Sequence, residues 1–148
     1  MAQNALRTRT RGDYVHFSEH KLRWSDNDQY GHMNNVVPYH LFDSLINAYL
    51  IEFCGREPQQ IGLVVSSYCH FFSSIAFPAT VDLGLRVVKL GTSSATYEVG
   101  IFERGNDQAC EIGGYTHVFV DRHTKEKGMS DEIRQALTRI LNQPKAHL

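Results

Sequence analysis

The longest apolar segment of the chain lies between residues 36 and 54, and its polar positions recur at helical spacing. These polar positions are His40, Asp43, Ser44 and Asn47. They fall on one narrow face, so apolar side chains cover the remaining circumference. Gly55 stands where a left-handed C-cap would end a helix of about 18 residues. The pattern therefore predicts a long helix that is buried on most of its sides.

The chain on either side of this segment has the patterns of β-strands. Between residues 81 and 87, for example, valine and leucine alternate with other residues, which is the period of a half-buried strand. The ranges predicted as strands are 14–25, 62–77, 81–87, 96–101 and 110–122. Ser130 is a good N-cap for a short amphipathic helix, whose apolar residues up to Leu141 are spaced by three and four.

The order of these elements predicts an α+β fold. The strands that follow the helix are joined by short turns such as "GTSS" and "RGND", which favours an antiparallel sheet. A helix that is apolar on most sides must be covered, so we expect a curved antiparallel sheet wrapped around it. We expect one domain over residues 13–148, a flexible tail over residues 1–12, and a short C-terminal helix.

Composition narrows the function classes. The chain has 148 residues, with 15 lysines and arginines against 16 aspartates and glutamates, so nucleic acid is not the expected partner. The charged and amide residues in the segment 36–54 rule it out as a membrane span. The chain has three cysteines, Cys54, Cys69 and Cys110. Their odd number and wide spacing argue against a disulfide framework and indicate a reducing compartment. We therefore expect the protein to be cytoplasmic. The mitochondrion is the alternative, because residues 1–12 hold three arginines and no acid, a composition shared with mitochondrial presequences.

Most of the ionisable chemistry that can be localised lies in residues 23–37, "RWSDNDQYGHMNNVV", directly ahead of the predicted helix. A helix N-terminus offers unpaired N–H groups and a positive partial charge. Such donors can polarise a carbonyl and stabilise the oxyanion that forms when the carbonyl is attacked. A nearby carboxylate can be the attacking group or the base that activates water. The apolar helix beside it would line a channel for an acyl chain.

This stretch has two other interpretations, a metal-binding loop and a purely structural role. "DNDQYG" begins like a calcium-binding EF-hand loop, but Tyr30 and Val37 occupy positions that require oxygen ligands, and no histidine set has the spacing of a zinc site. We therefore expect no metal. The second interpretation is structural, because Asp26, Asp28, Asn34 and Asn35 are residue types that form turns and cap helices. For Asp26 we expect a turn or packing role.

The stretch "RWSDNDQYGHMNN", followed by Tyr39 and the apolar helix, resembles the signature of hotdog-fold acyl thioesterases of the 4-hydroxybenzoyl-CoA thioesterase type. The resemblance covers residues 14–125, including "FPATVDLGLRVVKLGTSSATY" with its "G-x-S-S" turn. It implies a hotdog fold and the hydrolysis of acyl-CoA to a carboxylic acid and free coenzyme A. It implies no cofactor other than the coenzyme A that forms part of the substrate.

The resemblance also implies roles for particular residues. The family's catalytic carboxylate matches the second acid of D-x-D, Asp28, and its carbonyl-polarising backbone N–H matches Asn35. We expect Gly31, Asn34 and Tyr39 to contact the substrate, with Gly31 allowing a close approach of the backbone.

The H-x-N-N part is similar to plant acyl-carrier-protein thioesterases, in which the matching aspartate, an asparagine two residues later and the histidine are catalytic. Asp28 and His32 match that pattern, whereas Tyr30 replaces the asparagine. Two roles for His32 stay open, a catalytic base or a residue that orients Asp28 or caps the loop.

Hotdog domains pair edge to edge with sites at the shared interface, so the resemblance implies a homodimer or homotetramer. A different class of function is a non-catalytic module that binds acyl thioesters or lipids, for which Asp28 would be dispensable. The replacement at Tyr30 is the feature that leaves room for it.

Overall fold

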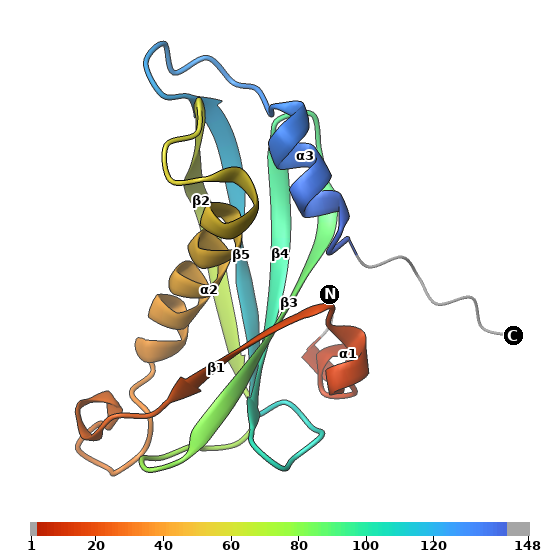
Figure 1. Ribbon diagram of the computed structural model, residues 1–148. Helices are drawn as coiled ribbons and strands as arrows, with labels where there is room; N and C mark the ends of the chain where they lie inside the picture. The colour runs from red at the N-terminus through yellow and green to blue at the C-terminus, as the bar shows by residue number, and fades with distance from the viewer. Residues whose placement is uncertain (1–2, 142–148) are drawn as a thin grey trace, which may run out of the picture.

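The computed structural model describes residues 3–141 (Figure 1). Within this range the chain forms three α-helices and five strands, joined in part by 3-10 turns at Arg11–Asp13 and Trp24–Asp26. The elements are α1 (Gln3–Leu6), β1 (His16–Lys21), α2 (Val37–Cys54), β2 (Gln60–Phe71), β3 (Thr80–Leu90), β4 (Ser94–Glu103), β5 (Glu111–Asp121) and α3 (Asp131–Thr138). The order of elements predicted for residues 13–141 is confirmed.

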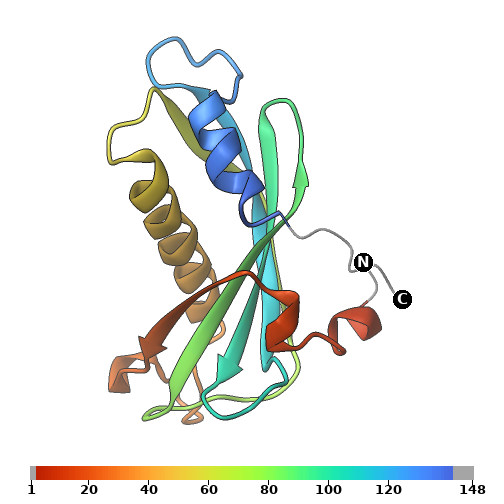
Figure 2. The ribbon, with the colours of Figure 1, turned by 45° about the vertical axis from the view of Figure 1, so that its right-hand side comes forward.

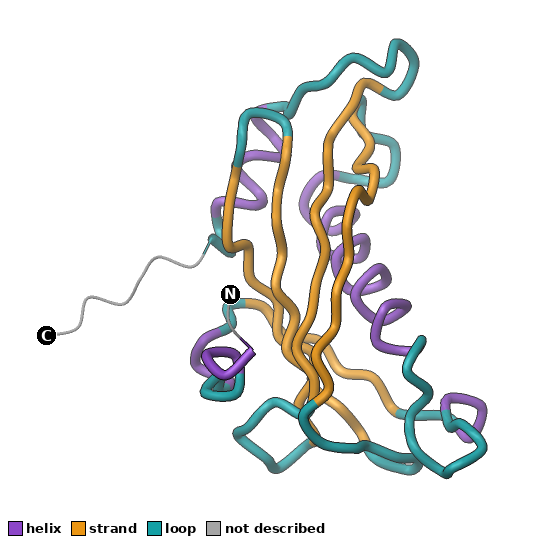
Figure 3. Tube along the Cα trace, turned by 180° about the vertical axis from the view of Figure 1, so that it is seen from behind, coloured by secondary structure: helices purple, strands orange, loops and turns teal. Residues whose placement is uncertain are grey.

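The five strands form one antiparallel sheet in the order β1-β3-β4-β5-β2. The long strands run side by side, and β2 lies at an edge (Figure 3). A register shift between Val64 and Ser66 places an extra residue in β2 opposite β5. Such a bulge reverses which alternate positions face each side of the sheet. The run predicted as a strand over residues 62–77 therefore shows no single period, and the strand itself ends at Phe71.

Helix α2 packs on the inner face of the sheet, beside α3 (Figure 2). Its buried Phe42, Ile46 and Tyr49 join a core with apolar strand residues such as Leu85 and Val99. Burial of a large apolar side chain is worth roughly 1.5–3 kcal/mol, so this contact is a main source of stability. The four predicted polar positions are exposed, but so are Tyr39, Ala48 and Ile51, so burial of α2 is confirmed only for the side that faces the sheet.

The ends of α2 agree only in part with the sequence. The helix has the predicted length, from Val37 to Cys54, and Gly55 follows it with φ +81°. However, the N-cap position is Val36 in a helical conformation, and no side chain caps it. The prediction that Asn34 or Asn35 is the N-cap is therefore wrong. Asn34 closes the turn before the helix instead, because its side-chain oxygen accepts a hydrogen bond from the Val36 N–H at 3.1 Å.

The N-terminal segment, residues 3–14, packs against the outer face of the sheet, opposite α2. Leu6 and Tyr14 are buried. The Tyr14 ring lies against Gly84 and Gly100, where any added Cβ would approach its ring atoms to 2.7–2.8 Å. The glycines are thus needed so that the ring can lie flat against two neighbouring strands. Residues 3–12, which we expected in a flexible tail, form α1 and a packed connection.

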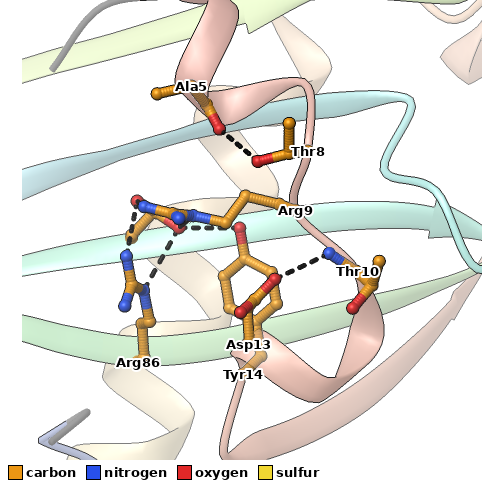
Figure 4. Close-up of polar contacts among 8 residues, drawn as sticks. Ala5, Thr8, Arg9, Thr10, Asp13, Tyr14 and Arg86 are labelled. Atoms are coloured by element: carbon orange, nitrogen blue, oxygen red, sulfur yellow. Dashed lines mark hydrogen bonds and ion pairs between the residues drawn. The ribbon is translucent and has the colours of Figure 1, made fainter. Parts of the chain in front are cut away.

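A buried ionic cluster fastens this segment to the sheet (Figure 4). Glu98 on β4 is 2% exposed, and its carboxylate accepts hydrogen bonds from Arg9 Nε at 3.0 Å, Arg86 Nη2 at 3.1 Å and Tyr14 Oη at 2.8 Å. Burial on its own would raise the pKa of Glu98, but the hydrogen bonds from Arg9 and Arg86 outweigh it, and the pKa is lowered. The charged form of Glu98 is therefore the native form.

Removal of this charge should destabilise the fold. We expect Glu98→Gln to lower the free energy of unfolding by about 3–5 kcal/mol, because two desolvated guanidinium groups lose their counter-charge. Urea unfolding followed by circular dichroism measures the change. The matched control is Glu103→Gln on the same strand, where the side chain is exposed and the expected change is within about 0.5 kcal/mol. Equal effects of the two substitutions would contradict this account.

Candidate active site

The loop ahead of α2 is closed by Asp28. Its Oδ1 atom accepts hydrogen bonds from the backbone N–H of Tyr30 at 2.8 Å and of His32 at 3.2 Å. Its own N–H donates to the His32 carbonyl at 2.7 Å. Gly31 sits at the tip with φ +78°, a left-handed conformation in which glycine is not strained. The carboxyl group is therefore held in one orientation by main-chain donors.

Asp26 anchors the start of the loop and is buried. Its carboxylate accepts from the Arg23 N–H at 2.8 Å, from Arg23 Nη2 at 3.1 Å, and lies 3.1 Å from His20 Nε2. These contacts use the side chain to hold the turn, as the sequence predicted for Asp26. The two aspartates of D-x-D thus differ in function. The carboxylate of Asp26 is occupied by structural hydrogen bonds, whereas Asp28 is half-buried and lines a cleft.

A second segment holds the loop in place. The Met33 N–H donates to the Ile75 carbonyl at 2.6 Å, and the Phe77 N–H donates to Asn27 Oδ1 at 3.1 Å. Residues 72–77 leave the end of β2, so these bonds join the start of α2 to the end of the sheet. The loop is consequently positioned by main-chain N–H groups, which donate to one carbonyl and to the side-chain oxygen of Asn27.

A cleft of ≈ 290 Å³ lies where the loop, residues 72–75 and the start of β5 meet. Asp28, His32 and Asn35 all line it, so the structure brings together the three residues predicted to be catalytic. Phe71, Phe72 and Ile75 add apolar surface. The three residues predicted to contact substrate do not line this cleft. They are Gly31, at the exposed loop tip; Asn34, bonded to Val36; and Tyr39, whose ring packs against Phe42.

The backbone N–H of Asn35 is an available donor in this cleft. Asn35 lies in the turn two residues before the first residue of α2. Within residues 3–141 its N–H donates no hydrogen bond, whereas the N–H groups of Asn34, Val36 and Val37 all have acceptors. An unpaired main-chain donor beside a helix N-terminus suits an oxygen that carries negative charge.

Glu111, the first residue of β5, is a member of the cleft that the sequence analysis missed. Its residue is 4% exposed, and its Oε2 atom is buried without a hydrogen-bond partner among the described residues. No other buried side-chain nitrogen or oxygen in residues 3–141 lacks a partner. Burial raises the pKa of Glu111 to about 7. A signal was present, because Glu111 lies on the same face of the strand as Tyr115 and Phe119, whose side chains enter the core.

Two further features are absent from residues 3–141. No group of three or more histidine, cysteine, aspartate or glutamate residues in this range is arranged to hold a metal ion. No helix in the same range has the length and apolarity that crossing a membrane requires.

Comparison with known proteins agrees with this fold. Residues 30–110 match the thioesterase superfamily. The crystal structure of the PA5185 protein of Pseudomonas aeruginosa is 42% identical, has a TM-score of 0.88, and covers 93% of this chain and 99% of its own. The YsmA protein of Bacillus subtilis is 24% identical over 82% of this chain and 84% of its own. The SAV2348 protein of Staphylococcus aureus, solved with coenzyme A, is 9% identical with a TM-score of 0.79, covering 89% and 87%.

A curved antiparallel sheet around a long helix, with a cleft where that helix begins, defines the hotdog class, and the predicted hotdog fold is confirmed. The chain belongs to the thioesterase superfamily.

The burial of Glu111 predicts a specific pH dependence of stability. The native pKa of about 7 lies above the ordinary value of 4.5, so the native state holds a proton that the unfolded chain has released between these pH values. The retained proton on Glu111 therefore adds to the free energy of unfolding below pH ~4.5. This contribution, about 3 kcal/mol at most, is lost as the pH rises through 7. Relative to wild type, Glu111→Gln should be more stable at pH 8 than at pH 5.

Urea unfolding of both proteins at the two pH values tests this, since other titrating groups cancel in the difference. Glu57→Gln, an exposed glutamate, should keep the wild-type dependence. A constant difference between wild type and Glu111→Gln would contradict the prediction.

Proposed function

We propose that this protein is an acyl-CoA thioesterase of the 4-hydroxybenzoyl-CoA thioesterase type, which cleaves acyl-CoA to a carboxylic acid and free coenzyme A. The observation that carries the proposal is the cleft shared by Asp28, His32 and the unpaired N–H of Asn35. An acyl group in this cleft has an acid on one side and a main-chain donor on the other. Membership of the thioesterase superfamily supports the same reaction.

The Asn35 N–H polarises the thioester carbonyl. The donor is free in the structure, so no internal hydrogen bond has to break before the carbonyl oxygen binds. Loss of one such donor typically costs ~2.7–4 kcal/mol of barrier. The group belongs to the main chain, so Asn35→Ala leaves it in place.

Asp28 acts on the carbonyl carbon, either by direct attack or by activation of a water molecule. The two N–H donors bind Oδ1, and within residues 3–141 Oδ2 has no hydrogen-bond donor. This leaves one carboxylate oxygen for the reaction while the other fixes its orientation. His32 contributes one of those donors through its backbone N–H and so orients Asp28 through the main chain.

The substrate class rests on two observations. The apolar side chains of Phe71, Phe72 and Ile75 in the cleft suit an acyl group. A protein with the same fold, SAV2348, was crystallised with coenzyme A. No cofactor is required, because water and the carboxylate supply the chemistry. We further propose a homodimer or homotetramer assembled through the edge strand β2, where Leu63, Val64 and Val65 are exposed.

Asp28→Asn tests the proposal with little disturbance of the loop, because an asparagine side-chain oxygen can accept the same two backbone N–H groups. We expect kcat for acyl-CoA hydrolysis to fall about 10²–10⁴-fold, since the amide neither attacks nor takes up a proton. Thiol release from short, long and aromatic acyl-CoAs, followed with a colorimetric thiol reagent, measures the change.

The control is Asp107→Asn, an exposed aspartate in the β4–β5 turn, which should keep wild-type kcat. Full activity in a folded Asp28→Asn variant would overturn the role of Asp28. Wild-type protein that binds acyl-CoA in calorimetry but releases no thiol would point instead to a binding module.

A further inference from the structure

The environment of Glu111 differs from that of a structural acid. Glu98 is a buried glutamate on the neighbouring strand β4. It accepts hydrogen bonds from two arginines and a tyrosine. Glu111 has none of these partners, and its strand neighbours are Phe71 on β2 and Ile101 on β4. A buried polar atom without a partner loses its hydrogen bonds to water and gains none in return, so its burial works against the fold. A group retained at such a cost at a cleft is a candidate for function.

Few titratable groups surround this carboxyl. Cys69 on β2 lies near it, and burial together with the proximity of Glu111 raises the pKa of that thiol to about 12, so the thiol carries no charge at neutral pH. Asp28 and His32 line the same cleft from the loop ahead of α2. Burial alone raises the pKa of Glu111 to about 7. Its carboxyl can therefore both give and take a proton near neutral pH.

We propose that Glu111 is a second catalytic residue of the cleft, which gives its proton to the leaving thiolate and then takes one from the water that completes hydrolysis. This rests on the proposed thioesterase function, and it assigns the attack on the acyl carbon to Asp28. The cleft supplies the geometry, because both acids and the Asn35 N–H line one space of ≈ 290 Å³.

In the first step Asp28 attacks the acyl carbon and the C–S bond breaks, with its electron pair passing to sulfur. The protonated Glu111 gives its proton to that sulfur, which leaves as the free thiol. The products on the protein are an Asp28–acyl anhydride and a Glu111 carboxylate.

In the second step a water molecule attacks the acyl carbon of the anhydride, and the Glu111 carboxylate takes one of its protons. The C–O bond to Asp28 breaks, and its electron pair returns to the Asp28 carboxylate. The carboxylic acid leaves, and both side chains are in their starting forms. The sum is thioester plus water giving acid plus thiol.

The first test is the pH profile of kcat/KM for wild type and Glu111→Gln on the acyl-CoA that wild type hydrolyses best. The first step needs protonated Glu111, so wild-type kcat/KM should fall above pH about 7. In Glu111→Gln this fall of kcat/KM above pH about 7 (the pH limb) should be absent, and below that pH kcat/KM should be about 10²–10⁴-fold lower than in wild type. Glu111→Asp, which keeps an acid, should restore part of the rate. Glu57→Gln serves as the control and should retain the wild-type profile.

The second test varies the leaving group. A thioester of thiophenol releases a stabilised thiolate that needs no proton to leave, so the defect of Glu111→Gln in kcat/KM should shrink at least tenfold relative to the acyl-CoA substrate. A purely structural role would slow both substrates equally and leave the pH limb in place.

The outcomes separate the two proposals. If wild type is active and Glu111→Gln stays within threefold with an unchanged pH profile, the role of Glu111 is overturned and the thioesterase proposal stands. An equal loss on both leaving groups with the pH limb retained also overturns it. If wild type releases no thiol from any substrate, the thioesterase proposal fails and the role of Glu111 fails with it.

Discussion

The packing of α2 on the inner face of the sheet is the contact on which the rest of the structure depends. The curved sheet covers the face of α2 that carries Phe42, Ile46 and Tyr49. This contact also decides where the helix begins relative to the strands. The start of α2 lies beside the end of β2 and the start of β5, and backbone hydrogen bonds from Met33 and Phe77 keep it there. The cleft is a by-product of that junction.

The two acids of the cleft are prepared in opposite ways. Asp28 receives two main-chain N–H groups, which fix the direction of its carboxylate. Glu111 receives none and is enclosed by apolar neighbours, which favours its neutral form. One acid of the cleft is thus oriented by the main chain, and the other is buried without a hydrogen-bond partner for its Oε2 atom among the described residues. A third acid, Glu98, binds the N-terminal segment to the sheet.

Sequence reasoning was most successful where a pattern repeats. The 18-residue helix and the alternating strand β3 could be predicted because each extends over several periods. Strand β2 was less clear, because the bulge near Val65 changes the phase of alternation midway. The N-terminal segment escaped detection because its contacts are single residues, Leu6, Arg9 and Tyr14, that match distant partners. The cleft residues near the motif were found together, whereas Glu111 lies over 70 residues from it in sequence and only strand pairing brings it there.

The ionic cluster around Glu98 has a consequence for how the chain is made. Arg9 and Tyr14 lie 89 and 84 residues ahead of the glutamate that holds them. The N-terminal segment is therefore synthesised long before β4, and during that interval Arg9 and Tyr14 cannot make their hydrogen bonds to Glu98. Chains are synthesised at ≈ 5–20 residues per second, so the wait is several seconds. The contact between the N-terminal segment and the outer face of the sheet is therefore completed only after translation has passed β4.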